Sequence, residues 1–369
     1  MSEFRTIREL CSVVVDCPHS TPKWTTSGKI VVRNNNIKHG RIDLSSPSYT
    51  DEEHFAQRIK RAKPQPGDII ITREAPIGDV GMIPENTECC LGQRMVLLRA
   101  DQSVCDNFYL LYSLQSLYVQ HQISWSEGTG TTVSNLRIPH LEQIQIPYLP
   151  IGQQMKISSV LRSLEEKIEN NRKLNDNLQQ QAQAIYSSMF IDNPDPAWSH
   201  GHLSDLITVK YGKDHKKLAD GIYPVYGSGG IMRYVERPLY NEESVLIPRK
   251  GTLNNVMYVN QPFWSVDTMF YTEMKLPNVA KFVYHFVKAK DLASMNAGSA
   301  VPSMTTDILN AMEVVIPSTS ALEEFESLVA PMYEAMEAND VQSKALSQMR
   351  DTLLPKLMSG EIGVSAVQL

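Results

Sequence analysis

Two short β-rich runs of this chain each end in basic side chains beside a turn. The run GDIIITR ends in Arg73, and the run SVLIPRKG contains Arg249 and Lys250 near its end. A side chain at the end of a strand is presented to a partner from a rigid base. The recurrence therefore predicts the same kind of binding surface in two copies.

Polar loops precede both runs. The segment VRNNNI contains Asn34 and Asn35, and the segment PVYGSGGI contains Tyr226 and Ser228. Asn and Arg side chains are suited to bidentate hydrogen bonds with adenine and guanine edges, although Asn-rich turns are also common for conformational reasons alone. The glycines of PVYGSGGI lack the Lys-Ser/Thr of a phosphate-binding loop and the spacing of a dinucleotide fingerprint. They favour a tight turn that lets the backbone approach a partner closely.

Further polar and basic residues recur at matching places. The segment LGQRM, with Gln93 and Arg94, follows the first run, and SVDTM, with Thr268, follows the second. Lys60 and Arg61 belong to a basic cluster. Such clusters are more often solvated faces than binding patches, but local charge, not net charge, governs contact with phosphates.

No motif of a catalytic site or metal site is present in the sequence. It contains no Walker loop, HExxH or GxSxG pattern, and the tetrapeptide NPDP lacks the aromatic residue of an amino-methylation motif. The five cysteines form no CxxC pair, which indicates structural thiols in a reducing compartment. The sequence predicts a binding protein that is not an enzyme and holds no metal or cofactor of its own.

Composition bounds the class of protein. The 369 residues allow two to three domains, and the chain contains no apolar run of membrane length and no visible signal peptide. We therefore expect a cytoplasmic location. The net charge is −6, but residues 1–150 carry 15 Lys+Arg against 16 Asp+Glu, whereas residues 321–369 carry 3 against 8. The globular parts are close to neutral, so a nucleic-acid partner is not excluded.

The chain is internally duplicated. Residues 128–147 and 298–317 lie 170 residues apart, and each runs from a Gly/Ser/Thr-rich loop through an apolar-alternating strand to Ile-Pro. A long helical segment follows each copy. A repeat of about 170 residues is too long for a unit of a solenoid protein. Each half of the chain is therefore expected to be one globular module followed by one long helix. The dipeptide Leu354-Pro355 is expected to interrupt the second helix late.

Seven-residue spacing is unbroken along both helical segments. A shift of 168 residues, or 24 heptads, superimposes the two ladders. An a/d ladder of about five heptads is the signature of a coiled coil. In an antiparallel pair the polar midpoints of the two ladders would meet and fix the register at some cost in stability. These midpoint residues are Asn171 and Asn175 in the first helix and Asn339 and Ser343 in the second. The alternative is that each helix packs only on its own domain.

The order of these features resembles the DNA-specificity subunit of type I restriction-modification systems. The segment PVYGSGGI and the tail LLPKLMSGEI are particularly similar to the sequence motifs of that family. The resemblance covers nearly the whole chain. It implies an α+β fold with two strand-rich target recognition domains, joined by two long helices in an antiparallel coiled coil with pseudo-two-fold symmetry. The expected parts are residues 1–150 and 193–320 for the recognition domains, 151–192 for the central helix and 321–369 for the C-terminal helix and tail.

The resemblance also implies partners. Each recognition domain would bind one half of a split double-stranded DNA site, and the helices would set the distance between the halves. Two modification subunits would carry the adenine-N6 methyltransferase chemistry with S-adenosylmethionine, and two restriction subunits can add ATP- and Mg-dependent translocation and cleavage. The rival hypothesis is a coiled-coil adaptor that binds other proteins instead of DNA. A nuclease is a third option, against which the missing metal carboxylates count.

These observations together give a set of residues that are expected to face DNA. One arginine of each matching pair could instead be a structural salt-bridge partner. The full set is Asn34, Asn35, Lys60, Arg61, Thr72, Arg73, Gln93 and Arg94 in the first domain, and Tyr226, Ser228, Arg249, Lys250, Asn254 and Thr268 in the second.

Overall fold

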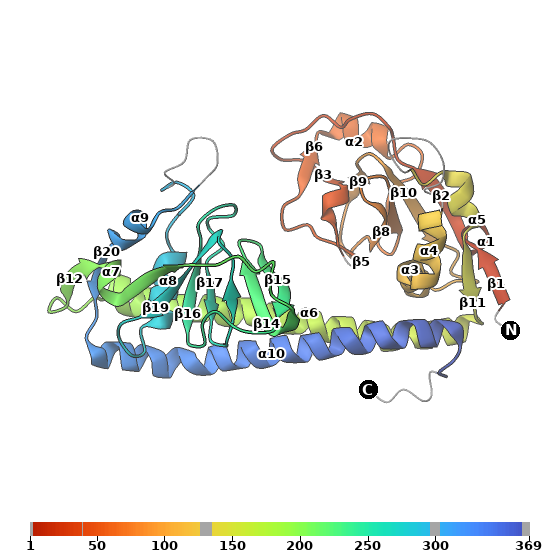
Figure 1. Ribbon diagram of the computed structural model, residues 1–369. Helices are drawn as coiled ribbons and strands as arrows, with labels where there is room; N and C mark the ends of the chain where they lie inside the picture. Colours follow the sequence, from red (N-terminus) through yellow and green to blue (C-terminus); the bar gives the residue numbers. More distant parts are fainter. Residues whose placement is uncertain (1–2, 39, 126–134, 296–302, 364–369) are drawn as a thin grey trace. The chain divides into compact units, whose positions relative to one another are not determined.

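The computed structural model describes residues 3–38, 40–125, 135–295 and 303–363 (Figure 1). The chain divides into two compact units: unit 1 comprises residues 1–170 and 341–369, and unit 2 comprises residues 171–340. We call the strand-rich part of unit 1 module 1 and that of unit 2 module 2. The glycine-rich loops that open the two sequence repeats, at Gly128 and Gly298, lie outside the described residues.

Module 1 is a mixed α/β domain. Its elements are, in chain order, β1 (Glu3–Thr6), α1 (Ile7–Leu10), β2 (Cys11–Asp16), β3 (Lys29–Val32), η1 (Asn34–Asn36), β4 (Ile37–Lys38), β5 (Gly40–Ile42), β6 (Ser48–Thr50), α2 (Glu52–Arg58), β7 (Ile69–Arg73), β8 (Ile77–Met82), β9 (Cys89–Leu91), β10 (Met95–Ala100), α3 (Asn107–Gln115), α4 (Leu117–Trp125), α5 (Ile138–Gln143) and β11 (Gln145–Tyr148). The main sheet has the order β2-β10-β7-β8-β5-β4, beside the smaller sheet β6-β3-β9 and the pair β1-β11.

The continuous apolar run of β7 is explained by burial on both faces of the main sheet. Ile69 and Ile71 belong to the core cluster that includes α3 and α4, whereas Ile70 belongs to the cluster on the opposite face. Strands covered on both faces are apolar throughout instead of alternating. Helix α3 begins where the carboxylate of Asp106 accepts a hydrogen bond from the amide of Tyr109, 2.9 Å away, as an N-cap does.

Module 2 is also mixed. Its elements are, in chain order, β12 (Ser199–His202), α7 (Leu203–Leu206), β13 (Ile207–Tyr211), β14 (Asp220–Gly227), β15 (Gly230–Val235), β16 (Ser244–Pro248), β17 (Met257–Val259), β18 (Trp264–Ser265), β19 (Met269–Met274), α8 (Ala280–Lys288), α9 (Thr306–Asn310) and β20 (Glu313–Ile316). The sheets have the orders β13-β19-β16-β17, β15-β14-β18 and β12-β20.

Both modules follow one pairing scheme, which confirms the duplication inferred from the sequence. In module 1, β10 lies between β2 and β7 in antiparallel pairing, and in module 2, β19 lies between β13 and β16 in the same way. The parallel pair β3-β9 has its counterpart in the parallel pair β14-β18. The antiparallel pair β1-β11 corresponds to β12-β20.

Two long helices carry the heptad ladders. Helix α6 (Ile151–Ser187) has 37 residues and continues into the π-helical turn η2 (Ser188–Asp192), and α10 (Thr319–Ser359) has 41 residues. The ladder positions of both helices are buried or partly buried. The expected interruption at Pro355 is wrong, because α10 continues past both Pro331 and Pro355. Both prolines lie on the exposed side of the helix, where the backbone can open away from the ring.

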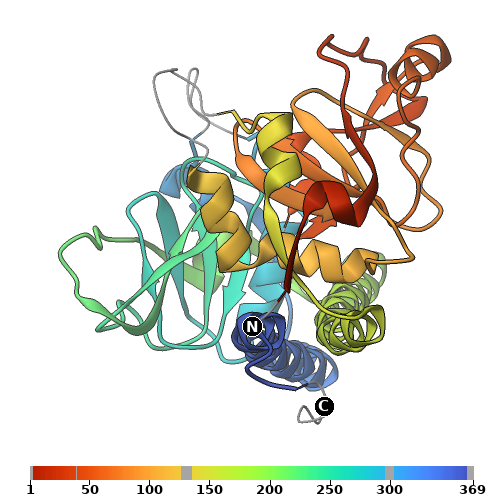
Figure 2. The same ribbon diagram turned by 90° about the vertical axis from the view of Figure 1, so that its right-hand side faces the viewer.

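The helices run antiparallel in each unit. In unit 1, Leu161 of α6 and Leu357 of α10 share one apolar cluster. In unit 2, the side-chain amide of Asn171 donates to the carbonyl oxygen of Asn339 (3.3 Å), and Asn339 donates to the Oδ1 of Asn175 (2.8 Å). Residue numbers therefore rise along α6 as they fall along α10. Figures 1 and 2 show the two helices side by side, so the alternative in which each helix packs only on its own domain is wrong.

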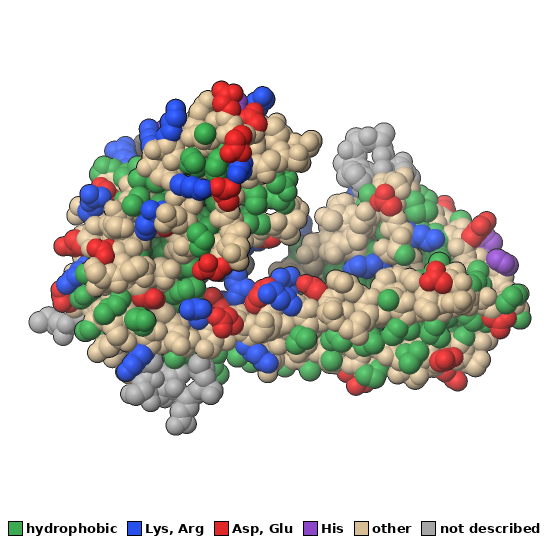
Figure 3. Space-filling view, turned by 180° about the vertical axis from the view of Figure 1, so that it is seen from behind, with side chains coloured by type: hydrophobic (Ala, Val, Ile, Leu, Met, Phe, Trp, Pro, Cys, Tyr) green, Lys and Arg blue, Asp and Glu red, His purple; other side chains and the backbone are tan. Residues whose placement is uncertain are grey.

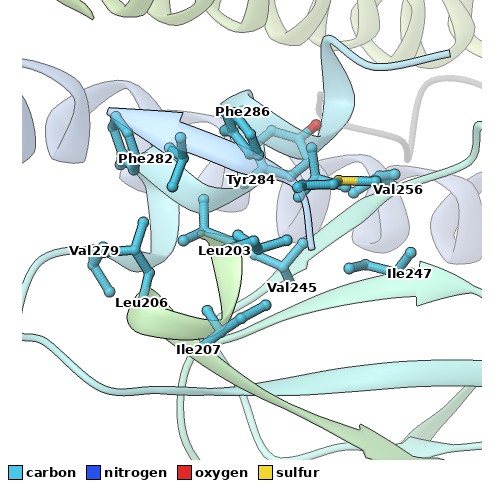
Figure 4. Packing of buried hydrophobic residues seen from close by; sticks show 14 of the residues in the cluster. Leu203, Leu206, Ile207, Val245, Ile247, Val256, Val279, Phe282, Tyr284 and Phe286 are labelled. Atoms are coloured by element: carbon cyan, nitrogen blue, oxygen red, sulfur yellow. The ribbon is translucent and has the colours of Figure 1, made fainter. Parts of the chain in front are cut away.

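The core of unit 2 joins module 2 to both helices. Its cluster includes Tyr186 of α6, Phe325 and Val329 of α10, and Phe282 of α8, all buried. Figure 4 shows the part of this cluster between α7, α8 and the sheet, where Phe282 points toward the helices. The rings of Tyr186 and Phe282 lie 5.6 Å apart, within the range of favourable aromatic contacts.

Membrane-spanning helices and metal sites are absent from the described part of the chain. Within it, no helix has the length and apolar character needed to cross a bilayer, and no three His, Cys, Asp or Glu side chains gather as a metal site would require. All five cysteines are buried and unbridged. Burial raises the pKa of Cys11 and of Cys89 to about 12, which makes both thiols unreactive.

A buried histidine ties α8 to both long helices. The Nδ1 of His285 lies 2.8 Å from Oε1 of Gln183 on α6, and its Nε2 lies 2.9 Å from the hydroxyl of Tyr333 on α10. The side chain is fully buried. Burial, with a smaller contribution from Lys288, lowers the pKa of His285 from 6.5 to about 4.

We predict that unit 2 loses stability in mild acid. In the unfolded chain His285 binds a proton near pH 6.5, whereas in the folded chain it does so only near pH 4, so the unfolded state gains protons first. Its contribution is therefore intact above about pH 6.5 and lost progressively toward pH 4, by up to about 3 kcal/mol. Urea unfolding at a series of pH values measures this loss. The variant His285→Gln, which does not titrate, should be less sensitive to pH in this window; an unchanged pH dependence would contradict the assignment.

Candidate nucleic-acid interface

Three loops meet at one end of module 1: the segment after β3, the end of β7 and the turn between β9 and β10. The amide of Gly92 donates to the carbonyl oxygen of Val32 (2.7 Å). The amide of Arg73 donates to the carbonyl oxygen of Arg94 (2.8 Å). These backbone bonds fix the loops to one another, so their side chains share one surface.

Module 2 repeats these bonds at the matching positions. The amide of Val266 donates to the carbonyl oxygen of Tyr226 (3.1 Å). The amide of Arg249 donates to the carbonyl oxygen of Thr268 (2.9 Å). The strand-end arginines of the two modules are therefore equivalent, and so are the turn positions of Arg94 and Thr268. The matching order seen in the sequence corresponds to matching places in space.

An open cavity of about 630 Å³ lies between the loops of module 1. Four residues expected to face DNA line it, together with the exposed or partly exposed Trp24, Arg33 and Lys38. The guanidinium carbon of Arg33 lies 5.1 Å from the centre of a Trp24 ring. A cation beside an aromatic face, with amides around it, suits the edges and faces of nucleobases. The four expected residues in the lining are Asn34, Asn35, Gln93 and Arg94.

The polar groups of this cavity are partly held by the module itself. The amide of Asn34 donates to the carbonyl oxygen of Glu74 (2.9 Å), and that of Gln93 donates to the carbonyl oxygen of His19. Arg94 has a φ of +65°, a left-handed conformation that is unfavourable for arginine, and its Nε lies 3.2 Å from a carboxylate oxygen of Glu74. Asn35 is exposed, so its side chain is accessible to a ligand.

Two residues of the expected set in module 1 are structural instead. Arg73 is only 12 % exposed: its Nη1 lies 3.0 Å from both carboxylate oxygens of Asp16, its Nε donates to the carbonyl oxygen of Leu136 (2.8 Å), and its Nη2 donates to Asn135 (3.1 Å). Thr72 is fully buried. The expectation that these two side chains face DNA is wrong, because their polar groups are used inside the module.

The equivalent arginine of module 2 is differently placed. The guanidinium of Arg249 lies 5.5 Å from the centre of the Tyr211 ring, and its Nη1 donates to the backbone oxygen of Asp267 (3.2 Å). Among the described residues no carboxylate pairs with it. Lys250 next to it is exposed, and Thr268 is partly exposed. As far as the described residues go, this surface therefore carries two cations without an ion-pair partner.

The turn between β14 and β15 adjoins Arg249 and Lys250. The side-chain amide of Asn255 donates to the backbone oxygen of Ser228 (2.8 Å), and a Cβ at Gly251 would lie 2.6 Å from the Ser228 hydroxyl. A Cβ at Gly229, by contrast, would meet nothing within 4 Å, and its φ is not in the left-handed region. Neither backbone conformation nor internal packing requires glycine at position 229.

Two further residues of module 2 differ from expectation. Tyr226 is 8 % exposed and packs with Phe263, so its ring is part of the core and does not reach a ligand. Asn254 is exposed, but its amide donates to Asp291 (3.0 Å) and its oxygen accepts from the amide of Ala293 (2.9 Å). Asn254 fastens two loops together, so its polar groups are used internally.

Lys60 and Arg61 lie apart from the cavity of module 1. Both follow α2, are exposed, and form no ion pair with any residue that the structure describes. Arg61 borders a separate small depression that also includes Asp16. Their exposure leaves both cations accessible to phosphates.

Sequence reasoning missed Trp24, Arg33 and Tyr211. Trp24 is 45 % and Tyr211 is 52 % exposed, which is high for large aromatic residues. Arg33 lies in the same VRNNNI segment as the amides that were singled out. For the aromatic residues no local pattern gave a signal, because the partners that place them beside arginines are distant in the chain.

Comparisons with known proteins agree on one family. The family described as the type I restriction modification DNA specificity domain matches residues 2–180 and 197–324 of this chain. The type I restriction enzyme MjaIX specificity subunit of Methanocaldococcus jannaschii is 25 % identical over 342 residues, covering 81 % of this chain and 78 % of the relative. A putative type I specificity subunit of Mycoplasma genitalium, S.MgeORF438P, is 24 % identical over 277 residues, covering 67 % and 70 %.

A solved structure shows the same fold. The crystal structure of a type I restriction-modification system S subunit from M. genitalium aligns with a TM-score of 0.60 and 20 % identity. The alignment covers 96 % of this chain and 95 % of that chain. The duplicated modules and paired helices described above are thus an architecture with precedent.

The two strand-end arginines should respond differently to truncation. Arg73→Ala leaves the largely buried Asp16 carboxylate without its guanidinium partner, with only the exposed ring of His19 still 2.9 Å away, and should lower the free energy of unfolding by about 3 kcal/mol. Arg249→Ala removes only a partly exposed contact with Tyr211 and should cost less than about 1 kcal/mol. Chemical denaturation of the two variants measures both values. Equal losses would show that Arg249 is as structural as Arg73.

Proposed function

The chain belongs to the family of type I restriction-modification DNA specificity domains, and from this membership we propose how its parts act on DNA. It is a specificity subunit and not an enzyme. Each module binds one half of a bipartite double-stranded target. The observation that carries this proposal is the duplicated loop cluster: one backbone framework presents amide and guanidinium groups in module 1, and guanidinium and ammonium groups in module 2.

The polar groups suit DNA better than a protein partner. Asn35 and Arg94 in module 1, and Arg249 and Lys250 in module 2, are exposed or partly exposed and carry the groups that bind base edges and phosphates. The family membership also favours DNA over the rival adaptor hypothesis. Lys60 and Arg61 act as phosphate contacts, and Ser228 and Thr268 lie at the edge of the module 2 surface.

The paired helices separate the two half-sites. The apolar ladder positions hold the two helices together but do not specify their register. The hydrogen bonds among Asn171, Asn175 and Asn339 can form in only one alignment of the helices. Ser343 continues this polar stretch along α10. We assign these four residues to the register of the coiled coil. The expected pseudo-two-fold relation of the recognition domains belongs to the same proposal.

Partner subunits supply the chemistry. Leu174 on α6 is 52 % exposed and Met349 on α10 is 46 % exposed, and Figure 3 shows further hydrophobic side chains along the helices. Apolar surface of this kind marks a place for other proteins to pack. Two modification subunits dock there, with S-adenosylmethionine for adenine-N6 methylation, and restriction subunits with ATP and Mg complete the complex. The chain itself requires no cofactor, and its DNA partner fits a cytoplasmic location.

Mapping the methylated motif tests the function. The chain is expressed with its modification subunits in a host free of adenine methylation, and N6-methyladenine is located by single-molecule sequencing. We expect a motif of two short specified halves around an unspecified spacer, because two modules bind separately. A host expressing only the modification subunits is the control. A continuous motif, or methylation that does not depend on this chain, would refute the proposal.

Shortening the helices should shorten the spacer alone. Deleting residues 171–177 together with 334–340 removes facing heptads and keeps the apolar phase, and it shortens each helix by about 10 Å. The spacer should lose about 3 base pairs while both half-sites keep their bases. Deleting only residues 171–177 is the matched control and should abolish assembly of the complex. An unchanged spacer, or altered bases, in the double deletion would contradict the role of the helices.

A further inference from the structure

One strand position decides how much of the strand-end arginine is available for a ligand. In module 1, Val96 of the central strand β10 lies opposite Asp16 of β2. In module 2, Phe270 of the central strand β19 lies opposite Tyr211 of β13. Because the two sheets have the same strand order around β10 and β19, Asp16 and Tyr211 occupy the same place.

The partner strands confirm this alignment. Thr72 lies opposite Met95 in module 1, and Pro248 lies opposite Met269 in module 2. The arginine follows directly in each case. Arg73 and Arg249 therefore reach residues 16 and 211 across equivalent positions of the central strand, β10 in module 1 and β19 in module 2.

The two neighbours have opposite effects on the arginine. The Asp16 carboxylate neutralises Arg73 and accepts from its Nη1, while Leu136 and Asn135 accept from Nε and Nη2. Tyr211 instead lies against the guanidinium of Arg249 at 5.5 Å and accepts none of its hydrogen bonds. An arginine whose guanidinium lies over an aromatic face still points its N–H groups outward in the guanidinium plane, where other acceptors can bind them.

The residues next to the two arginines also differ in charge. Position 250 is an exposed lysine, whereas the residue after Arg73 is Glu74, whose carboxylate oxygens lie close to Arg94 and Asn135. The backbone oxygen of Asp267 accepts a hydrogen bond from only one nitrogen of the guanidinium, the Nη1 of Arg249, at 3.2 Å. Most of the planar guanidinium fork is thus unused by the described residues.

We propose that Arg249 recognises a guanine in the half-site of module 2, with Tyr211 as the positioning residue that keeps its fork available. Arg73 reads no base in module 1, where the Asp16 carboxylate occupies it. Guanine offers O6 and N7 as two adjacent acceptors in the major groove, which match the two donors of an arginine fork. This inference rests on the proposed function, because it assigns one base pair within the bipartite target.

The test measures base preference in the methylated motif. Full-length variants are expressed with the modification subunits, and the motif is mapped on the genomic DNA of a methylation-free host. Tyr211→Asp recreates the neutralised arginine of module 1 and should relax the preference for one G·C pair by about 10- to 100-fold, in one half-site only. Tyr211→Phe keeps the ring and should leave the motif unchanged.

Two lysine substitutions complete the design. Arg249→Lys keeps the charge but loses the fork, so it should relax the same G·C pair as Tyr211→Asp. Arg73→Lys should leave the bases of both half-sites unchanged. Circular dichroism and co-purification with the modification subunits establish that each variant is folded and assembled. Because Arg249→Lys makes only a small change in a partly exposed side chain, it keeps the test decisive if Tyr211→Asp does not fold.

The possible failures are distinguishable. If the unsubstituted complex yields no bipartite motif, the proposed function fails and this inference fails with it. If the unsubstituted complex yields a bipartite motif but Arg249→Lys preserves every base preference, the inference alone is wrong. A change in both half-sites with Tyr211→Asp, or a changed base with Arg73→Lys, also overturns it.

Discussion

Each module buries apolar side chains of both long helices in its own core, and the rest of the structure depends on this packing. In unit 1 the shared cluster joins Leu161 of α6 to Leu357 of α10, and in unit 2 it joins Tyr186 to Phe325. Neither module completes its core with its own strands and short helices alone. The helices are therefore part of each module's fold.

Polar groups interrupt this apolar packing at the midpoint of the helices. Asn171 is buried, and its side-chain NH2 group donates to the carbonyl oxygen of Asn339, which limits the desolvation cost of that group. A wholly apolar seam would adhere more strongly but would tolerate sliding by a heptad. The unit boundary, between residues 170 and 171 and between 340 and 341, falls at this polar stretch.

The duplicated scaffold allows the two surfaces to diverge at little cost. The backbone bonds that hold the loops are the same in both modules, so they do not depend on the side chains that face a ligand. The Asp16 carboxylate makes Arg73 a structural residue, whereas the Tyr211 ring leaves Arg249 charged and accessible. Exchange of single residues at fixed strand positions thus alters the chemistry of a surface while the core below it is kept.

The sequence by itself determined the features that depend on local order and periodicity. The heptad ladders predicted two long helices and the approach of Asn171 and Asn175 to Asn339 and Ser343, because a period of 3.5 residues fixes which side chains share a face. The hydrogen bonds to Asn339 confirm the part of this prediction that concerns Asn339. The repeat predicted two modules with matching strand ends. Only the tertiary structure decided which of those strand-end side chains are available, since Asp16 and Arg73 are 57 residues apart and Tyr211 and Arg249 are 38 apart. Such contacts depend on strand pairing, which carries no local signal, and so Thr72, Arg73 and Tyr226 were misassigned from the sequence.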